Sequence, residues 1–306
     1  MPQLKTKPGA ERRRFSPDVI ETYTVQAETT LLPFLIESMP QRKRTNVKEL
    51  LKHNQVKAGS TVTTKFDHPL APGDTVQVNL TREFPQFKNH RLKIVHEDDD
   101  IIVVNKGYGL LSMGNDRIKE GTAYSILKDY LKWVDPRQKI FIVHRLDQQT
   151  SGLMMFAKKP DAKDKMQHNW NNMVLNRKYV CVVEGYVEQE QGVVKSYLAE
   201  NSRYEVYSTE NPEEGQLAVT RYKVLKRGSG HTMLEVELDT GRKNQIRVHM
   251  ADMGHPIAGD RKYGARPASI HRLALHAQTL RFVHPISRRE MNFSTPIPAS
   301  FFKLVH

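Results

Sequence analysis

Hydrophobic positions in the N-terminal part of the chain predict two helices and a small sheet. In TTLLPFLIESM (29–39) and NVKELLKHNQV (46–56), leucine, isoleucine and valine recur at the spacing of an amphipathic helix. The proline of the first stretch is tolerable because it falls in the first helical turn. Farther on, the valines of TVQVNL (75–80) alternate with polar residues, as in a half-buried strand. We therefore expect a compact module over residues 19–82, preceded by a flexible basic tail over residues 1–18.

The remainder of the chain follows a proline-containing linker at residues 83–91 and contains more predicted strands than helices. Turn residues separate the apolar stretches at short intervals, which indicates hairpin-like connections. Strands are expected at LKIVHE, IIVVNK, KIFIV, SGLMMFA, RKYVCVVEGYV, TRYKVLKR and TMLEVELD, and helices at TAYSILKDYLKW, AKDKMQHNWNNMV and KNQIRVHMADMG. The predicted fold class for residues 92–306 is α+β, with a mixed, largely antiparallel sheet.

The net charge of the chain indicates the kind of partner that it binds. The 306 residues carry a formal net charge of +13, and the pI is about 9.6. So basic a chain favours a polyanion, with nucleic acid first and an anionic membrane second, although no basic amphipathic helix supports the membrane. The single cysteine, Cys181, excludes a disulfide framework and a multi-cysteine zinc site. No secretory leader and no membrane span are recognisable, so we expect a cytoplasmic monomer.

Two patterns that resemble cofactor or metal sites are discounted. The acidic run EDDD (97–100) lies between two apolar strands, where a solvated hairpin turn is the commoner explanation, and no histidine or further carboxylate completes the spacing of a metal site. The glycines of KGYGLLSMG (106–114) miss the spacing of a dinucleotide fingerprint. We therefore expect neither a metal nor a cofactor.

Basic residues cluster at the ends of the second predicted helix. Arg42, Lys43 and Arg44 precede it, and Lys52 and Lys57 accompany its end. These side chains are either a solvated surface or a set of phosphate contacts, and their recurrence at both ends of the helix favours the contacts. The order of elements, together with APGDTVQV, resembles the alpha-L RNA-binding module, which is named from ribosomal small-subunit protein four.

The stretch HRLDQQTSGL (144–153) places one aspartate, Asp147, between two apolar runs. Polar groups at a strand end commonly line a cleft, where a rigid support suits a functional site. Aspartate in such a position also accepts hydrogen bonds from turn amides. The spacing alone slightly favours the turn-capping role.

Four further motifs change this balance. They are RKY (177–179), GRKNQIRVH (241–249), GHPIAGDRKYG (254–264) and LHAQTLRFVHP (275–285), in this order after HRLDQQTSGL. Together they resemble the RluA-type pseudouridine synthases over about residues 92–306, and members of that family often carry an alpha-L module ahead of the catalytic domain. The resemblance implies the fold of that family, and a reaction in which a uridine of RNA is detached from its sugar, turned, and rejoined through carbon 5. It implies no cofactor.

The resemblance also implies catalytic roles for three residues. Asp147 is the carboxylate that acts at the sugar, either as a nucleophile at the anomeric carbon or as a base at the neighbouring carbon. Arg247 is its counter-ion, since arginine stays charged and binds carboxylates through two hydrogen bonds. Tyr179 lies near the base, where its ring stacks on uracil and its hydroxyl takes part in removing the proton from carbon 5. Without the motif, Tyr179 is better explained as a half-buried strand aromatic.

Substrate-binding roles follow for four more residues. Arg145 is expected to fill the gap left by the flipped base or to hold its phosphate, and Arg242 to contact the substrate. His144 is expected to support the site, and a purely structural histidine is the alternative. Leu275 packs in the uracil pocket or in the core.

Two departures from the family pattern and two rival functions remain. The chain has Gly107 where the family commonly has proline, and Asn244 where it commonly has histidine. The first rival is a non-catalytic RNA-binding protein of the same fold, and the second is a glycoside hydrolase with Asp260 as its second carboxylate. Asp260 is better explained as a loop anchor holding a backbone turn. The charge and the alpha-L module favour ribosomal RNA of the large subunit as the substrate, with transfer RNA as the alternative.

Overall fold

The structure, a computed structural model, describes residues 18–59, 61–114, 118–267 and 269–306. It divides into two compact units, with the boundary between Gln86 and Phe87. The tail expected over residues 1–18 lies almost wholly outside the described residues, so it stays a prediction. Within the described part of the chain, no helix is long and apolar enough to cross a membrane.

The first unit holds both predicted helices and a four-stranded sheet ordered β1–β6–β3–β4, beside a short β2–β5 pair. Its elements are β1 (Ile20–Thr24), β2 (Thr29–Thr30), α1 (Leu31–Ser38), α2 (Arg44–Lys52), β3 (Val56–Ala58), β4 (Thr61–Val62), β5 (Pro69–Leu70) and β6 (Thr75–Asn79). The helices bury the apolar positions that predicted them, including Leu35 of α1 and Val47 of α2. Burial of these side chains holds the two helices on one core.

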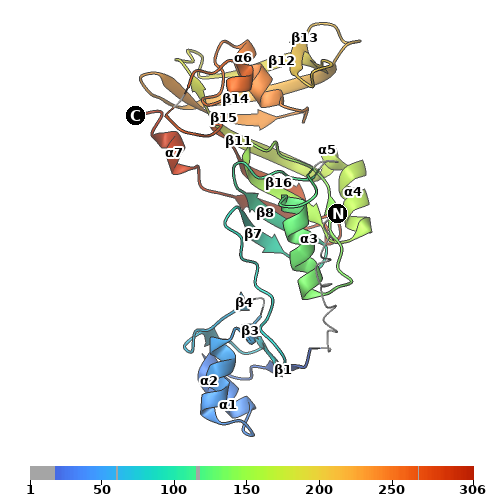
Figure 1. Cartoon of the computed structure of the whole chain (residues 1–306), viewed down its shortest axis with the longest axis vertical. Coiled ribbons are helices and arrows are strands. Elements are labelled where there is room, and N and C mark those ends of the chain that lie inside the picture. Colours follow the sequence, from blue (N-terminus) through green and yellow to red (C-terminus); the bar gives the residue numbers. More distant parts are fainter. Residues whose placement is uncertain (1–17, 60, 115–117, 268) are drawn as a thin grey trace, which may run out of the picture. The chain divides into compact units, whose positions relative to one another are not determined.

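The second unit is built on a long sheet of eleven strands with the helices at its periphery (Figure 1). Its first half contains β7 (Leu92–Glu97), β8 (Ile101–Lys106), α3 (Ala123–Val134), β9 (Phe141–Ile142), β10 (Ser151–Ala157), α4 (Pro160–His168), α5 (Trp170–Met173) and β11 (Val174–Glu184). Its second half contains β12 (Gln191–Glu200), β13 (Val206–Thr209), β14 (Gln216–Arg227), β15 (His231–Leu238), α6 (Gln245–Asp252), the 3-10 turn η1 (Arg261–Tyr263), β16 (Leu275–Val283), β17 (Glu290–Ser294) and α7 (Ala299–Phe302).

The sheet follows the order β13–β12–β14–β15–β11–β16–β10–β8–β7, with β17 beside β16 and β9 beside β10. Its strand pairs are antiparallel apart from β10 with β16. The predicted class, α+β with a largely antiparallel sheet, is therefore confirmed. The parallel pair brings the start of β10, directly after Asp147, beside the start of β16, so two motifs far apart in sequence meet there.

A glycine, Gly152, allows β10 and β16 to approach each other closely. Gly152 has φ +116° at the start of β10, and a Cβ there would lie 2.2 Å from the carbonyl oxygen of Ala277 on β16. Only glycine combines that backbone conformation with so close an approach. The TSG turn thus fixes the direction in which the chain leaves the Asp147 loop.

Helix α6 differs from its prediction. The sequence suggested an amphipathic helix with one apolar face, but every residue from Gln245 to Met250 is buried. The helix packs against β12, β13 and β14, and Thr220 of β14 accepts a hydrogen bond from Gln245 and contacts His249. Strands β12 and β13 were not predicted as strands, although their pairing supplies much of this contact.

Candidate active site

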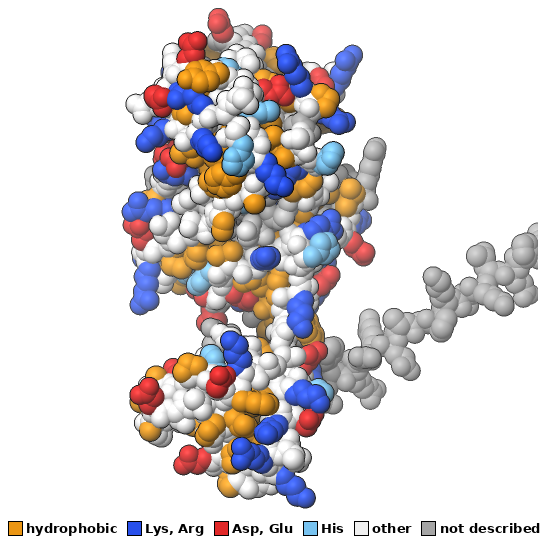
Figure 2. All heavy atoms as spheres, turned by 90° about the vertical axis from the view of Figure 1, so that its left-hand side faces the viewer, with side chains coloured by type: hydrophobic (Ala, Val, Ile, Leu, Met, Phe, Trp, Pro, Cys, Tyr) orange, Lys and Arg blue, Asp and Glu red, His pale blue; other side chains and the backbone are white. Residues whose placement is uncertain are grey.

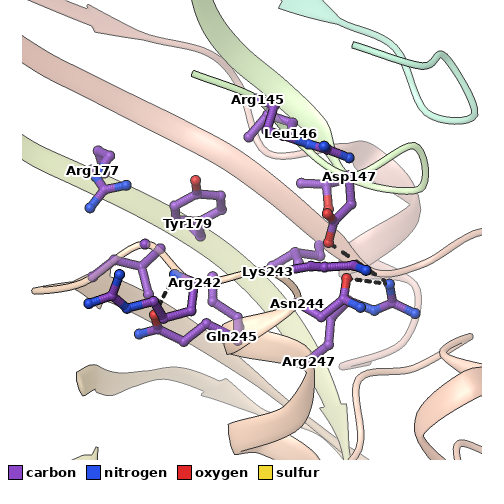
Figure 3. A pocket seen from close by; sticks show the side chains of 15 residues that line it. Arg145, Leu146, Asp147, Arg177, Tyr179, Arg242, Lys243, Asn244, Gln245 and Arg247 are labelled. Carbon is purple, nitrogen blue, oxygen red and sulfur yellow. Dashed lines mark hydrogen bonds and ion pairs between the residues drawn. The ribbon is translucent and has the colours of Figure 1, made fainter. Parts of the chain in front are cut away.

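A cavity of about 200 Å³ opens where the Asp147 loop, β11 and the start of α6 come together (Figure 3). It is smaller than the roughly 300–1,000 Å³ of pockets for drug-sized ligands, which suits a single base. Of the seven residues predicted to be catalytic or substrate-binding, six line the cavity and His144 does not. The lining residues include Arg145, Asp147, Tyr179, Arg242, Arg247 and Leu275.

Asp147 lies in the loop between β9 and β10 and points into this cavity (Figure 3). The turn after it is closed by main-chain atoms, because the amide of Thr150 donates to the carbonyl oxygen of Asp147 at 3.1 Å. No amide of a described residue donates to its carboxylate. Asp147 is therefore not a side-chain turn cap, and its 26% exposed side chain is left facing the pocket.

Arg247 of α6 approaches Asp147 but binds another carboxylate more closely. Its Nη1 lies 3.9 Å from Oδ2 of Asp147, whereas its Nε and Nη2 donate to the two oxygens of Asp260 at 2.6 and 2.7 Å. Burial acts to lower the pKa of Arg247, but the hydrogen bonds and charge of Asp260 outweigh it and raise that pKa. The guanidinium is thus a fixed positive charge beside Asp147.

Asp260 anchors a loop, as expected: its carbonyl oxygen accepts from the amides of Tyr263 and Ala265, both at 3.1 Å. Its side chain has a further role, because both carboxylate oxygens accept from Arg247 and the side chain is only 1% exposed. A carboxylate buried this deeply requires such a partner. Asp260 therefore acts through Arg247, and it is not placed as a second carboxylate of the cavity that holds Asp147.

Asn244, where the family commonly has histidine, completes the support of Arg247. It has a left-handed backbone with φ 54°, which asparagine tolerates better than most residues. Its Oδ1 accepts from Nη1 of Arg247 at 3.1 Å, and its Nδ2 donates to the hydroxyl of Tyr263 at 3.0 Å. The Tyr263 ring in turn lies 4.9 Å from the Arg247 guanidinium carbon. The asparagine that replaces the histidine common in the family is therefore held by hydrogen bonds to Arg247 and Tyr263.

A buried lysine holds the other side of the Asp147 loop. The Nζ of Lys106 donates to the carbonyl oxygens of Leu110 at 2.8 Å and of Gln148 at 3.3 Å. Burial lowers the pKa of Lys106 to about 7, against the opposing effect of the Asp147 charge. The next residue, Gly107, donates its amide to the carbonyl oxygen of Arg91 at 2.6 Å, a bond that the proline common in the family cannot make. The sequence did not reveal this lysine as part of the site.

Tyr179 comes from the middle of β11 and reaches the cavity from the sheet. Burial raises the pKa of its hydroxyl, so the side chain is a neutral phenol at physiological pH. Leu275, at the start of β16, lines the same cavity and also belongs to the hydrophobic core, so both roles expected of it apply. Arg177, two residues before Tyr179, lines the cavity as well, although no separate role was predicted for it.

The other cations of the cavity lie at its rim. Arg145 is exposed, and no described residue forms a hydrogen bond or ion pair with its side chain. Arg242 donates from Nε to the carbonyl oxygen of Leu217 at 3.0 Å, and Lys243 pairs with Glu200. The rim therefore offers Arg145 as an uncommitted cation.

His144 does not line the cavity. Its Nε2 accepts a hydrogen bond from the amide of Met155 at 3.0 Å, and its ring lies 4.8 Å from that of Trp170. Burial lowers the pKa of His144 to about 3, with the Arg177 charge acting in the same direction. It is a neutral, structural histidine, so we leave it out of the substrate-binding set.

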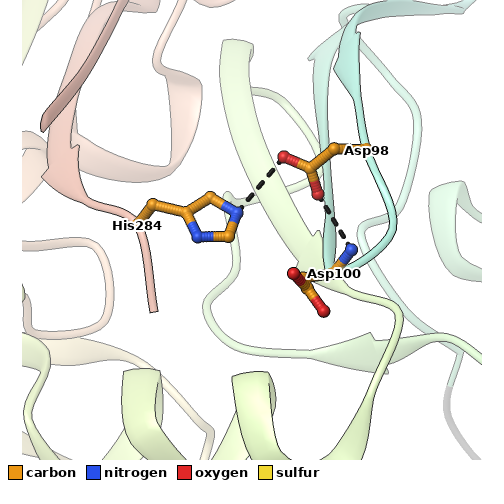
Figure 4. A group of neighbouring side chains, drawn as sticks. All are labelled: Asp98, Asp100 and His284. Atoms are coloured by element: carbon orange, nitrogen blue, oxygen red, sulfur yellow. Dashed lines mark hydrogen bonds and ion pairs between the residues drawn. The ribbon is translucent and has the colours of Figure 1, made fainter. Parts of the chain in front are cut away.

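The acidic turn after β7 lies beside a histidine from far along the chain (Figure 4). His284 lies beside Asp98 and Asp100, and its Nε2 contacts Oδ2 of Asp98 at 3.2 Å. However, Nδ1 of His284 accepts from the amides of Ile286 and Ser287, so Nε2 carries the proton of the neutral ring and donates to Asp98. With both nitrogens engaged, the cluster is a hydrogen-bonded brace rather than a set of metal ligands.

The basic residues of the first unit lie around α2, as their positions in the sequence indicated. Lys43 precedes the helix, Arg44 begins it, and both are exposed. Arg42 is half-buried, Lys52 pairs with Glu49 at 3.3 Å, and Lys57 lies on β3. On the face shown in Figure 2, lysine and arginine are interspersed with acidic and apolar side chains. A role in RNA contact stays a prediction for these five residues, as does the alpha-L assignment.

Comparison with known proteins identifies this combination of fold and site. The RNA pseudouridylate synthase family matches residues 100–252. Ribosomal large subunit pseudouridine synthase D of Escherichia coli O6:H1 is 33% identical over 288 residues, covering 89% of this chain and 88% of the relative. The Bacillus subtilis protein named "Uncharacterized RNA pseudouridine synthase YlyB" is 34% identical over 282 residues, covering 89% and 91%.

Solved structures agree. Human RNA Pseudouridylate Synthase Domain Containing 4 superposes with a TM-score of 0.57 at 25% identity, covering 68% of this chain and 90% of that one. Human RNA Pseudouridylate Synthase Domain Containing 1 shares the fold with a TM-score of 0.55. The chain belongs to the RNA pseudouridylate synthase family, as its resemblance to the RluA type predicted, and it is an RNA pseudouridine synthase.

Proposed function

We propose that this enzyme isomerises uridines in large-subunit ribosomal RNA, and that Asp147 acts on the sugar of a uridine flipped out of its stack. The observation that carries the proposal is that Asp147 is the one carboxylate among the residues lining the base-sized cavity. A glycoside hydrolase of the usual kind needs two carboxylates across the bond. A protein that only binds RNA has no need of a lone carboxylate facing its pocket.

The reaction consumes no co-reactant. The N1–C1′ bond of uridine breaks, the C5–C1′ bond forms, and the proton that leaves C5 is balanced by one gained at N1. Asp147 serves either as the nucleophile at C1′ or as a base at C2′, and in both cases it must be ionised. The guanidinium of Arg247, with Nη1 3.9 Å from Oδ2 of Asp147, supplies a positive charge beside this carboxylate.

Tyr179 is proposed to receive the base. Its ring offers a stacking surface for uracil, which has no charge to bind. Because burial raises the pKa of its hydroxyl, the phenol acts by stacking and hydrogen bonding while neutral, and an ionised form is not required. Arg145 at the rim is proposed to occupy the gap left in the RNA, or to hold the adjoining phosphate.

Large-subunit ribosomal RNA is proposed as the substrate because of the names of two relatives, which are 30 and 33% identical to this chain. Both are called ribosomal large subunit pseudouridine synthase D, and the matches span 94 and 88% of their lengths. A net charge of +13 suits any RNA, so charge alone does not choose. Pseudouridines should be mapped at single-nucleotide resolution in total RNA from cells with and without the gene. Loss of one or a few large-subunit positions, restored by re-expression, is expected. An unchanged map, or losses confined to transfer RNA, would overturn the assignment.

A further inference from the structure

A second cavity, of about 390 Å³, shares one lining residue, Arg247, with the base cavity. Its other charged lining residues are Asp260, Arg261, Lys262 and Arg272. Both oxygens of Asp260 are occupied by Arg247. The remaining three cations therefore face this cavity without a carboxylate to balance them among its lining residues.

Arg272 is held by two aromatic rings and two neutral hydrogen-bond acceptors. Its guanidinium carbon lies 5.2 Å from the ring centres of both Tyr108 and Phe301. Its Nε donates to the carbonyl oxygen of Leu273 at 3.1 Å, and its Nη2 donates to Oγ of Ser151 at 2.6 Å. Aromatic rings and neutral acceptors thus hold the side chain in place.

What Arg272 lacks is a counter-ion. No carboxylate of the described residues forms an ion pair with it, and no described residue accepts a hydrogen bond from its Nη1. Burial lowers the pKa of the guanidinium, yet arginine remains charged because its ordinary pKa lies above about 12. A half-buried charge with no opposite charge beside it is costly, so binding of an anion would stabilise it.

The surrounding backbone is shaped to keep this side chain in position. Gly259 has φ +81°, and a Cβ there would lie 2.3 Å from the carbonyl oxygen of Arg272. Oγ of Ser151, which accepts from Arg272, is also hydrogen-bonded to Nδ1 of His276 at 2.8 Å, and Nε2 of His276 contacts Oγ1 of Thr295. The hydrogen bond from Arg272 therefore links the second cavity to Ser151, four residues after Asp147.

We infer that the second cavity is a phosphate subsite, in which Arg272, Arg261 and Lys262 bind a backbone phosphodiester of the RNA strand whose uridine enters the first cavity. Planar guanidinium groups match phosphate oxygens through paired hydrogen bonds. The shared wall at Arg247 makes a phosphate near the flipped nucleotide the fitting ligand. The inference rests on the proposed function for its substrate class.

The test is the salt dependence of binding to a stem-loop RNA with unpaired uridines in its loop. Each phosphate contact contributes about 0.7 to the slope of log Kd against log salt for single strands. We expect Arg272→Gln and Arg261→Gln each to reduce the slope by about that amount and to weaken binding several-fold at low salt. Lys132→Gln, at an exposed position on α3, is the matched control and should leave the slope unchanged.

Arg261 is exposed, and no described residue pairs with its side chain, so its variant tests the subsite even if Arg272→Gln fails to fold. Slopes equal to that of the wild type in a folded Arg261→Gln protein would overturn the inference. In a second arm, inorganic phosphate is titrated against the wild type at constant ionic strength. Phosphate binding without any change of RNA slope in the variants would assign the cavity to free phosphate and overturn the RNA assignment. Failure of the proposed function would appear separately, as an unchanged pseudouridine map.

Discussion

The guanidinium of Arg247 holds the carboxylate of Asp260 through two hydrogen bonds, 2.6 Å from Nε to Oδ2 and 2.7 Å from Nη2 to Oδ1. The Asp260 side chain is 1% exposed and that of Arg247 is 11% exposed, so the pair is buried. This pairing uses two of the three nitrogens of Arg247 and leaves Nη1 on the side of Asp147. The positive charge beside the proposed catalytic carboxylate is therefore positioned by a second carboxylate behind it.

Removing the charge of Asp260 should destabilise the protein and impair the reaction. Asp260→Asn keeps the shape but leaves Arg247 as an unbalanced buried charge, which costs about 3–5 kcal/mol in comparable pairs. Urea unfolding measures the free energy, and pseudouridine formation per folded molecule measures the activity. Asp239→Asn is the control, because Asp239 pairs with the exposed Arg221 and should cost about 0–1 kcal/mol. Equal losses in the two variants would show that the buried pair has no special role.

Two histidines, the half-buried His144 and the buried His276, should make the protein less stable in mild acid. The pKa of His144 is lowered to about 3 by burial and by Arg177, and that of His276 to about 4 by burial and by Arg272. The unfolded chain, with histidine pKa values near 6.5, binds more protons than the folded chain between these limits. Stability is therefore fully present above about pH 6.5 and is lost as the pH falls toward 4.

The expected loss is about 2 kcal/mol per histidine between pH 7 and pH 5. The free energy of urea unfolding at the two pH values measures it. His144→Gln removes one titrating group, so its free energy should fall less steeply with pH than that of the wild type. Identical pH dependence in the two proteins would mean that His144 is protonated without cost in the folded state.

The basic residues at the start of α2 should contribute to RNA affinity in a salt-dependent way. Lys43 and Arg44 are both exposed, so replacing both with glutamine leaves the core intact. If each contacts a phosphate, the slope of log Kd against log salt falls by about 0.7–0.9 per contact. Lys132→Gln with Lys139→Gln, at exposed positions of the second unit, is the control of equal charge. A loss of slope no larger than in this control would remove the first unit's helix from the RNA-binding surface.

Much of the fold was accessible from the sequence because its signals are local. The periodicity of TTLLPFLIESM and NVKELLKHNQV predicted α1 and α2, and the all-apolar SGLMMFA became the fully buried β10. Strand β12 was missed because only one of its residues, Leu198, is buried, so it lacks a strong apolar pattern. Helix α6 was predicted with one apolar face because its polar side chains find partners only in the folded state.

The sequence predicted which residues form the site, but not which of them contact one another. Motif order identified Asp147, Tyr179 and Arg247, and these three line one cavity. The pairing of Arg247 with Asp260 depends on a loop that folds back over thirteen residues, which no periodicity encodes. Lys106 appeared as the last residue of a strand, and its contact with the Asp147 loop spans forty-two positions.

His144 was expected to support the site, with a purely structural histidine as the alternative. Its ring contacts the amide of Met155 and the ring of Trp170, which favours the structural alternative. The side chains of adjacent loop residues can point in different directions, and the sequence does not show the direction of each one.

The central claim, that Asp147 performs the chemistry, is tested most directly by Asp147→Asn. Single-turnover release of tritium from RNA labelled at C5 of uridine measures the reaction, since the C5 proton must leave. We expect no detectable release from Asp147→Asn, with unchanged unfolding free energy and RNA binding, and full release from Asp129→Asn, an exposed carboxamide control on α3. Tritium release by a pure Asp147→Asn protein at a rate near that of the wild type would contradict the account.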